Sequence, residues 1–476
     1  MNRMISTSRP NIIYINADDL GWTDPGFMGS AYHETPNLDR FASEGMVFTN
    51  AYAPAANCAP SRACCLTGNY TPRHGVYTVK GSERGESADR KLIPTPNTLF
   101  IDKNKPSMAT VLRDAGYATC HVGKFHVGAD PLDYGFDENV GGGHWGNPRS
   151  YFSPYGAPDN LPAKHDGEYL TDRLADESID FIERHKDTPF FLYLATYTVH
   201  GPLQAKEEKI EKYRRKETTD IHNHPVYAAM VESLDENVGR ILSALDALGL
   251  GENTLVLFTS DNGGVYKVTR QWPLRAGKGS YYEGGIREPM AVRWPGKVPQ
   301  GSVCHVPVHG VDLLPTFAEA AGASCPECDG RSLIPLLTGE GRFPERSLFW
   351  HFPVYLQNGH AESQDPIFRT RPGSAIRTGE WKLIEYFENG DLELYHLTED
   401  VGEKHNLAET QPEKAAELLV ALRSWREETR APVPTELNPE FTASAANLKT
   451  IQSAKLNNNS WTPPLDGDEQ VRLKRT

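Results

Sequence analysis

The sequence predicts an α/β fold, with a large, mostly parallel mixed sheet flanked by helices and a small C-terminal α+β domain with an antiparallel sheet. Two observations support this prediction. Short apolar runs alternate with amphipathic helical segments over most of the chain, which is typical of βα units around a parallel sheet. Towards the C-terminus this pattern changes to closely spaced alternating strands separated by a turn. A chain of 476 residues is long enough for both domains.

Four short apolar runs are predicted as buried strands of the large sheet. They cover residues 11–16, 117–122, 190–197 and 254–259. A helix is predicted over residues 226–248, because apolar residues recur there at helical spacing.

The smaller domain is predicted over residues 367–430. Its strands are expected at 374–377, 382–386 and 392–395, with a hairpin turn at 388–391 and a helix at 412–429. The larger domain would then cover residues 1–366. Residues 431–476 would form an extended arm, because they are rich in proline, asparagine and threonine.

Composition excludes several classes of partner. The net charge of −14 argues against binding to nucleic acid. No apolar run is long enough to span a bilayer, so no membrane partner is expected. The first ten residues are polar and basic, with no apolar stretch behind them. The sequence as given therefore predicts a cytoplasmic protein, or a periplasmic or secreted one if a leader was removed. Nothing in the sequence sets the oligomeric state.

The seven cysteines are odd in number and irregularly spaced, so they do not predict a disulfide framework. Cys325 and Cys328 form a C-x-x-C pair without a second pair or a histidine cluster. This pattern favours a loop with free or paired thiols over a zinc site.

Ionisable or amide side chains follow all four predicted strands. Each group alone could be a helix cap or an ordinary turn. In open α/β sheets, however, ligands bind beyond the carboxyl ends of the strands. Because polar groups follow all four strands at that end, a common site is favoured. In strand order the groups are Asp18 and Asp19; Lys124 and His126; His200; and Asp261 and Asn262.

These groups also make chemical sense together. Carboxylate and amide oxygens suit Ca²⁺ or Mg²⁺ rather than zinc, and three crowded carboxylates would repel one another without a dication. The nearby cations could hold a tetrahedral anion. A metal beside a basic cradle is expected for sulfuryl or phosphoryl transfer. The candidate cations are Arg62, Lys124, His126, His200 and Lys278.

Residues 58–62 read Cys-Ala-Pro-Ser-Arg, a C-x-P-x-R motif. In chain order the sequence has Asp-Asp, C-x-P-S-R, Gly-Lys-x-His, His-x-Pro, Asp-Asn-Gly-Gly and then a lysine. This order resembles the type I, formylglycine-dependent sulfatases of the alkaline-phosphatase superfamily, over residues 10–406. The resemblance implies an alkaline-phosphatase-like fold. It also implies that a formylglycine-generating maturation enzyme oxidises Cys58 to an aldehyde, whose hydrate is the nucleophile.

The resemblance also implies a role for each site residue. Asp18, Asp19, Asp261 and Asn262 would ligate one Ca²⁺, rather than Mg²⁺, together with the formylglycine at position 58. Arg62 would stabilise the hydrate, and Lys124 and Lys278 would bind sulfate oxygens. Lys267 and Arg275 are alternatives to Lys278. His200 would protonate the departing alcohol, with Lys278 as a second donor, and His126 would act as base when sulfate is eliminated.

A glycine-rich loop at 141–149 and a histidine near the motif are candidates for substrate contact. The alternative is a surface loop with incidental aromatic residues. Polar groups beside an aromatic ring suit a sulfated sugar, so a small sulfated saccharide is the expected substrate. An aryl sulfatase, a phosphonate or phosphodiester hydrolase of the same superfamily, and an inactive binding homologue are the alternatives. The candidate contact residues are His74, His144, Trp145 and Arg149.

Overall fold

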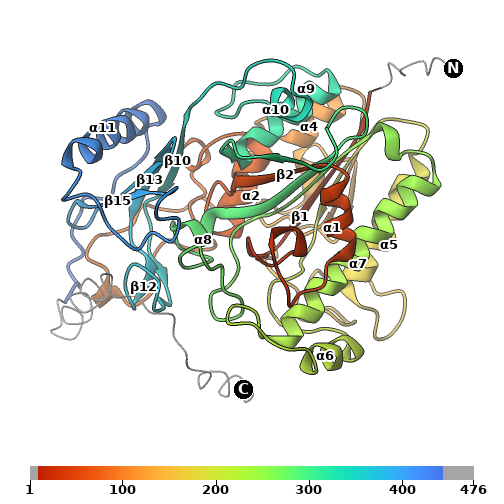
Figure 1. Cartoon of the computed structure of the whole chain (residues 1–476), viewed down its shortest axis with the longest axis horizontal. Helices are drawn as coiled ribbons and strands as arrows, with labels where there is room; N and C mark the ends of the chain where they lie inside the picture. The colour runs from red at the N-terminus through yellow and green to blue at the C-terminus, as the bar shows by residue number, and fades with distance from the viewer. Residues whose placement is uncertain (1–8, 443–476) are drawn as a thin grey trace.

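The computed structural model describes residues 9–442. Within this range a nine-stranded sheet runs through the larger part of the molecule, and a four-stranded antiparallel sheet lies to one side of it (Figure 1). Two short strands form a separate ribbon next to the smaller sheet. The predicted combination of a large, mostly parallel mixed sheet and a small antiparallel sheet is confirmed.

The strands of the large sheet are β1 (Asn11–Ala17), β2 (Met46–Tyr52), β3 (Ala118–Gly123), β4 (Glu138–Val140), β5 (Phe190–Ala195), β6 (Thr254–Ser260), β7 (Arg287–Arg293), β8 (Ser302–Cys304) and β9 (Val308–His309). The smaller sheet contains β10 (Ser347–Phe352), β13 (Gly373–Thr378), β14 (Trp381–Tyr386) and β15 (Asp391–His396). The ribbon pairs β11 (Leu356–Gln357) with β12 (Phe368–Thr370).

The α-helices are α1 (Pro36–Ser43), α2 (Cys58–Thr67), α3 (Thr71–His74), α4 (Met108–Asp114), α5 (Leu170–Arg184), α6 (Glu207–Arg214), α7 (Pro225–Ala247), α8 (Glu283–Ile286), α9 (Leu313–Ala321), α10 (Ile334–Thr338) and α11 (Pro412–Thr429). Short 3₁₀ turns are η1 (Gly26–Met28), η2 (Ser87–Asp89), η3 (Pro131–Tyr134), η4 (Gly251–Asn253) and η5 (Gly310–Asp312).

The strand order of the large sheet is β4-β3-β5-β1-β6-β7-β2-β8, with β9 also on β2. Strands β4, β3, β5, β1 and β6 are all parallel. Strand β7 runs antiparallel to both of its neighbours, β6 and β2. The carboxyl ends of β1, β3, β5 and β6 therefore meet at one edge of the sheet, where ligands bind in open α/β folds.

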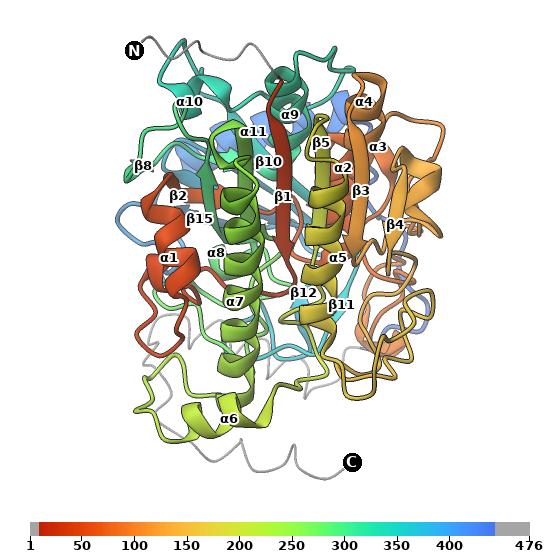
Figure 2. The ribbon, with the colours of Figure 1, turned by 90° about the vertical axis from the view of Figure 1, so that its right-hand side faces the viewer.

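Side chains of the central strand β1 alternate between two cores, as strand geometry requires. Ile13 and Ile15 pack on the face covered by α5 and α7. Ile12 and Tyr14 pack on the face covered by α2, α4 and α9. Figure 2 shows α5 and α7 lying in front of the strands. Because both faces are covered, the strands read as continuous apolar runs rather than as alternating ones.

The predicted elements differ from the observed ones only at their ends. Strand β3 begins one residue later than predicted, because the Tyr117 amide bonds to the Leu112 carbonyl at the end of α4. Strand β5 ends at Ala195, two residues before the predicted end. The observed bounds of α11 equal the predicted range of 412–429.

The predicted domain limits can be compared with the residues that form each sheet. Strand β10 lies before the predicted boundary at 366/367 and pairs with β13 of the smaller sheet. The described start of the predicted arm runs along the loop that precedes α4, where Leu437 forms an antiparallel bridge with Leu92. Residues 443–476 of the predicted arm lie outside the described residues.

Two further sequence predictions concern thiols and membranes. Cys325 and Cys328 are both free thiols, with their sulfur atoms 3.8 Å apart. None of the described helices combines the length and the apolar content needed to cross a membrane.

A buried ion network joins the two sheets. Lys382 on β14 lies 2.9 Å from Glu283, at the start of α8, and 2.8 Å from Glu403, and all three side chains are fully buried. Tyr52 of β2 also donates to Glu283. Removing one partner of such a network leaves an uncompensated charge out of water, so the lysine should be essential for stability.

We expect Lys382→Met to lower the free energy of unfolding by about 3–5 kcal/mol, because two buried carboxylates would lose their shared cation. Chemical denaturation followed by circular dichroism measures this. Lys414→Met is the control, since Lys414 forms an exposed pair with Glu417 and should change stability by no more than about 0.5 kcal/mol. Equal effects of the two substitutions would contradict this role for the network.

Candidate active site

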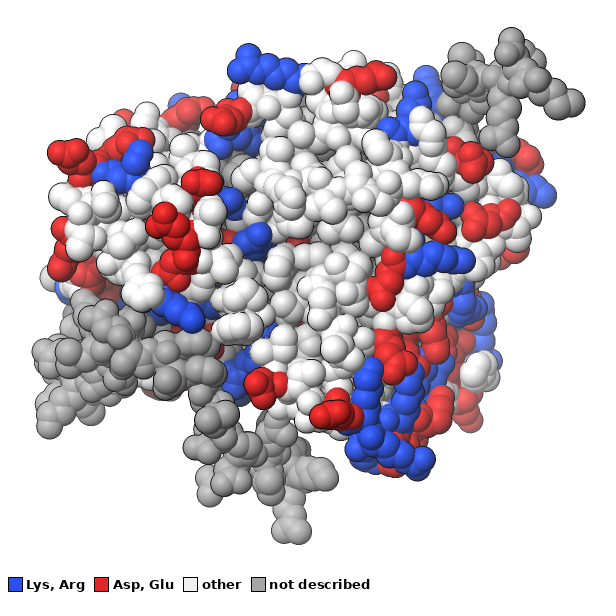
Figure 3. Space-filling model, in the orientation of Figure 1, with Lys and Arg blue, Asp and Glu red and all other residues white. Residues whose placement is uncertain are grey.

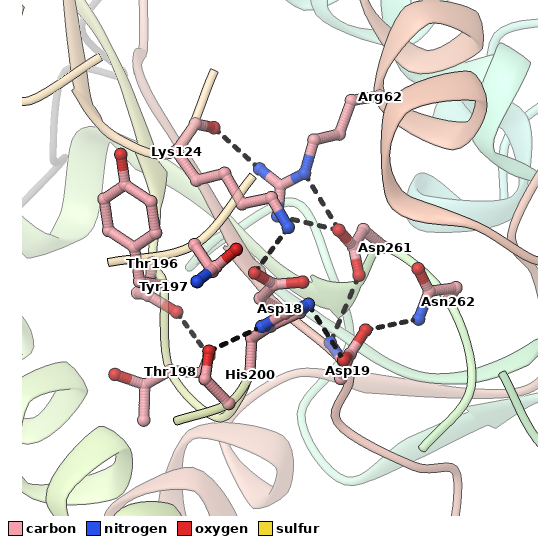
Figure 4. A network of polar contacts seen from close by, with 12 residues as sticks. Asp18, Asp19, Arg62, Lys124, Thr196, Tyr197, Thr198, His200, Asp261 and Asn262 are labelled. Atoms are coloured by element: carbon pink, nitrogen blue, oxygen red, sulfur yellow. Dashed lines mark hydrogen bonds and ion pairs between the residues drawn. The ribbon is translucent and has the colours of Figure 1, made fainter. Parts of the chain in front are cut away.

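The predicted site residues that follow β1, β3, β5 and β6 meet at one edge of the large sheet (Figure 4). Their loops are tied together by backbone hydrogen bonds. The Asp18 amide donates to the Thr198 carbonyl after β5, and the Asp261 amide donates to the Ala17 carbonyl of β1. The Lys124 amide donates to the Ala195 carbonyl. Strand pairing thus continues into the loops and fixes the groups that they carry.

Two of the three buried aspartates each pair with one cation. Lys124 Nζ lies 2.7 Å from Asp18 Oδ2. Arg62 Nε and Nη2 both lie 2.8 Å from Asp261 Oδ2. The Arg62 Nη1 also donates to the carbonyl of Lys124, which links the two pairs. All four side chains are fully buried, so these charges compensate one another out of contact with water.

The third aspartate, Asp19, is contacted from three directions. Lys278 Nζ donates to its Oδ1, and the Asn262 amide donates to the same oxygen at 2.8 Å. His200 Nε2 lies 3.6 Å from its Oδ2. Of the three cations considered from the sequence, Lys278 is therefore the one that contacts the aspartate cluster. Lys267 is exposed, and Arg275 bonds to the carbonyl of Glu403.

The pKa values of the cluster follow from burial and these pairs. Burial raises the pKa of Asp18, and Asp261 and Asp19 raise it further against the effect of Lys124. Although burial opposes it, Lys278 and His200 hold the pKa of Asp19 below its usual range. Burial and Lys278 lower the pKa of His200 to about 3, so this imidazole is neutral near pH 7. Its Nδ1 lies 2.8 Å from the Gly201 carbonyl and can only donate there, which leaves Nε2 as an acceptor towards the site.

The oxygen atoms of the cluster fit a hard divalent cation. Asp18 Oδ1 and Asn262 Oδ1 are buried and have no hydrogen-bond partner among the described residues. Buried polar atoms are normally paired, so unpartnered oxygens within a cluster of aspartates suit a cation ligand set. Asp18, Asp19 and His200 also place ligand atoms within 4.8 Å of one another. The donor set therefore fits the predicted Ca²⁺.

Cys58 is the first residue of α2, a helix in which every residue is buried. Pro60 is tolerated because it lies in the first turn, and Gly68 ends the helix in the left-handed conformation that favours glycine. Arg62 follows Cys58 by four residues, so both side chains lie on one helix face. The Gly279 amide, one residue after Lys278, donates to the carbonyl of Ala56, two residues before Cys58, at 2.8 Å. The motif spacing thus delivers residue 58 to the aspartate and lysine cluster.

His126 occupies a strained position at the edge of the cluster. Its φ of 68° lies in the left-handed region, and its amide donates to the Gly143 carbonyl at 2.8 Å. Gly146 lies against its ring, since a Cβ there would be 2.8 Å from two ring atoms. Its Nδ1 is buried without a hydrogen-bond partner among the described residues, and burial, Lys124 and Arg62 lower its pKa well below the usual value. This imidazole is therefore neutral near pH 7, and its low pKa makes it a weak base in the free protein.

The candidate substrate contacts separate into two groups. The rings of His144 and the half-buried Trp145 pack against each other at a tilt of 34° in the loop that lies against His126, which places them beside the cluster. Arg149 is exposed and packs on Gly156. His74 Nε2 contacts the Cys64 thiol on the far side of α2, within a different core, so the structure does not bring it to the cluster.

A second buried network supports the loop that carries Asp19, whose φ of 64° is also left-handed. Asp24 accepts hydrogen bonds from Gly21 N and Tyr227, and it lies 3.2 Å from His222. The Tyr227 hydroxyl is also 3.2 Å from the Asp19 carbonyl. Neither Asp24 nor Tyr227 could be identified from the sequence, because their role depends on contacts between distant segments.

Figure 3 shows lysines and arginines interspersed with acidic residues over one face of the molecule, most densely near α6. On α6 itself, Lys212 and Arg214 pair with nearby glutamates. The net charge of −14 thus coexists with a buried site in which Arg62, Lys124 and Lys278 are each paired with an aspartate. This arrangement is compatible with an anionic substrate that is attracted only at short range.

Comparisons with known proteins agree with this geometry. The family described as Sulfatase matches residues 10–323, and the family described as N-sulphoglucosamine sulphohydrolase, C-terminal, matches residues 277–430. A sulfatase of Formosa agariphila is 34% identical and covers 90% of each chain. The N-acetylgalactosamine-6-sulfatase of Sus scrofa is 36% identical over 72% of this chain and 68% of its own.

Among solved structures, that of Ps i-CgsB in complex with k-i-k-neocarrahexaose has a TM-score of 0.74 and 29% sequence identity, and the match covers 96% of this chain and all of the other. The fold, the ordered motifs and these matches lead to one conclusion. The chain belongs to the formylglycine-dependent sulfatase family of the alkaline-phosphatase superfamily and is a sulfuric ester hydrolase.

Proposed function

We propose that this sulfatase removes a sulfate monoester from a sulfated carbohydrate, using a formylglycine made from Cys58 and a bound Ca²⁺. The observation that carries the proposal is the position of Cys58, at the buried start of α2 beside Lys278 and the aspartate cluster. The carbohydrate substrate is supported by the names of two relatives, N-acetylgalactosamine-6-sulfatase and Ps i-CgsB with k-i-k-neocarrahexaose. An aryl sulfatase is the second candidate, because human arylsulfatase A is 32% identical over 87% of this chain.

Formylglycine would supply the nucleophile, and Ca²⁺ would supply positive charge. A hydrated formylglycine at position 58 supplies an oxygen nucleophile where a thiol is encoded. Asp18, Asp19, Asp261 and Asn262 would hold the Ca²⁺, which neutralises charge on sulfate oxygens. Formation of the aldehyde needs a separate maturation enzyme as a partner. A cytoplasmic location, or export with removal of a leader, remains a prediction from the sequence.

The residues of the chain itself would position the sulfate and move protons. Lys124 and Lys278 carry ammonium groups that already bind aspartate oxygens and can bind sulfate oxygens in the same place. Arg62 forms an ion pair with Asp261 and so fixes the position of that carboxylate. His200 would protonate the departing alcohol, and because its imidazole is neutral in the free protein, it must first gain a proton as the anionic substrate binds. His126, with its unpaired Nδ1, would accept a proton when sulfate leaves.

The modification of Cys58 gives the first test. Mass spectrometry of the peptide that contains position 58 should find formylglycine in active protein. Cys58→Ser should complete at most one turnover and accumulate a sulfated serine, because a simple alcohol ester cannot eliminate sulfate as an aldehyde hydrate can. Cys304→Ser, at a buried cysteine on β8, is the control and should keep full activity. Sustained turnover by Cys58→Ser would contradict the proposal.

Removal of the metal gives a second test. Ca²⁺ at about 100 times its Kd should raise the free energy of unfolding by about 2.7 kcal/mol, and a chelator should reverse this gain. Asp18→Asn should abolish most of the gain, because Asp18 Oδ1 is one of the unpartnered oxygens. Asp180→Asn, at an exposed position on α5, should not. Calorimetric melting with and without Ca²⁺ measures both, and an unchanged gain in Asp18→Asn would show that the ion binds elsewhere.

The role of His200 as proton donor predicts a dependence on the leaving group. His200→Asn should lower kcat/KM for a sugar sulfate by about 10²- to 10⁴-fold, since an alkoxide leaves poorly without a proton. With 4-nitrophenyl sulfate the loss should be much smaller, because that leaving group needs little protonation. His405→Asn, at an exposed histidine, is the control. Equal losses with both substrates would argue for binding rather than proton donation.

A further inference from the structure

Two arginines that no sequence motif marks lie beside the candidate active site. Arg369 on β12 donates from Nη1 to the carbonyl of Lys278 at 3.2 Å. It also packs on Gly279, where an added Cβ would be only 2.8 Å from its Cδ. The amide of Gly279 in turn donates to the carbonyl of Ala56, two residues before Cys58. The backbone of Lys278 and Gly279 therefore links Arg369 to the segment just before Cys58.

Arg84 approaches the same place from the loop after α3. Its Nε donates to Gln357 Oε1 on β11 at 2.7 Å, and its Nη1 donates to the Val79 carbonyl at 2.9 Å. Gln357 pairs with Phe368, the residue before Arg369, so β11 and β12 hold both arginines. The start of this loop is also anchored near residue 58, because the Asn57 amide lies 3.4 Å from Thr78 Oγ1.

The charges of the two arginines are not neutralised within the described residues. Neither forms an ion pair there, and their hydrogen bonds go only to carbonyl and amide oxygens. In contrast, Lys124, Lys278 and Arg62 each have an aspartate partner. Both arginines are half-buried, so the surplus positive charge is partly shielded from water and can attract an anion strongly.

Electrostatic effects agree with this placement. Burial lowers the pKa of Arg84, and Cys58 acts in the opposite direction. Burial also lowers the pKa of Arg369, with Asp19 opposing the shift and Arg84 adding to it. Arg84 and Arg369 thus repel each other, and an anion placed between them would relieve that repulsion.

We propose that Arg84 and Arg369 form a subsite for a second anionic group of the substrate, a carboxylate or another sulfate next to the sulfate that is removed. The substrate class would then be an acidic saccharide with at least two anionic groups. Guanidinium groups bind carboxylate and sulfate oxygens in pairs, which suits either anion. This inference rests on the proposed function, because it assumes that the sulfate ester occupies the cluster around Cys58.

Binding to the Ca²⁺-loaded Cys58→Ala variant tests the inference without turnover. Isothermal calorimetry would compare three disaccharides that share one sulfate ester: one with no other charge, one with a uronate carboxylate and one with a second sulfate. We expect the uronate, the disulfate or both to bind about tenfold or more tightly than the singly charged disaccharide. The two acidic arms identify which anion the subsite prefers. Equal affinity for all three disaccharides would overturn the inference.

Substitutions in the same background assign the effect to the two arginines. Arg84→Gln and Arg369→Gln should each reduce the preference for the acidic disaccharide by about tenfold, and Arg84→Lys and Arg369→Lys should keep part of it. Arg113→Gln removes the same charge from α4, at the opposite end of the sheet, and should leave the preference unchanged. A preference that survives both glutamine variants, or an equal loss of affinity for all three disaccharides, would contradict the subsite.

The failure of the proposed function would look different. In that case, protein shown to contain formylglycine and Ca²⁺ would release sulfate from none of the three disaccharides. The binding preference of the Cys58→Ala variant would still be measured independently. Sulfate release with the same kcat/KM from all three would instead support the proposed function and overturn the subsite.

Discussion

Three aspartates held out of water at one end of a parallel sheet require compensating charge, and much of the structure supplies it. Isolated buried carboxylates would be far too costly to keep ionised. Here Lys124 comes from the loop after β3, Arg62 from α2 and Lys278 from the segment before α8. Each cation approaches from a different direction, so the sheet edge, the buried helix and the C-terminal half of the chain must all be in place. The site is therefore formed only by the complete fold.

The smaller sheet takes part in this arrangement rather than lying apart from it. Lys382 on β14 is locked to Glu283 at the start of α8, a few residues after Lys278. Arg369 on the β11–β12 ribbon packs directly on Gly279. Two independent contacts thus hold the segment that carries Lys278. The strands of the large sheet fix the predicted metal ligands and Lys124, whereas the smaller sheet and its ribbon hold the segment of Lys278.

Much of this could be predicted from the sequence, because local patterns determine it. Apolar runs define the strands. Because the carboxyl ends of parallel strands lie at the same side of the sheet, Asp18, Asp261 and their neighbours are predicted to meet there. The one-to-one pairing of aspartates and cations could not be predicted, since it depends on side-chain packing between distant segments. The same limit explains His74, which lies near the C-x-P-x-R motif in sequence but contacts Cys64. It also explains Arg84, which lies in a loop, and Arg369, which lies on the three-residue strand β12, because no periodicity or motif marks either residue.

The pairing of three aspartates with three cations has a thermodynamic consequence. With all three carboxylates ionised, the charges of Asp18, Asp19, Asp261, Lys124, Lys278 and Arg62 sum to zero. A dication that enters this neutral site would bind the carboxylates and release the lysines from them. An anion that enters it would bind the lysines and release the carboxylates. Each ligand therefore prepares the site for the other, and linkage requires the effect to be reciprocal. Ca²⁺ and a sulfate ester should bind cooperatively, so that apparent metal affinity becomes a property of substrate concentration as well as of the protein.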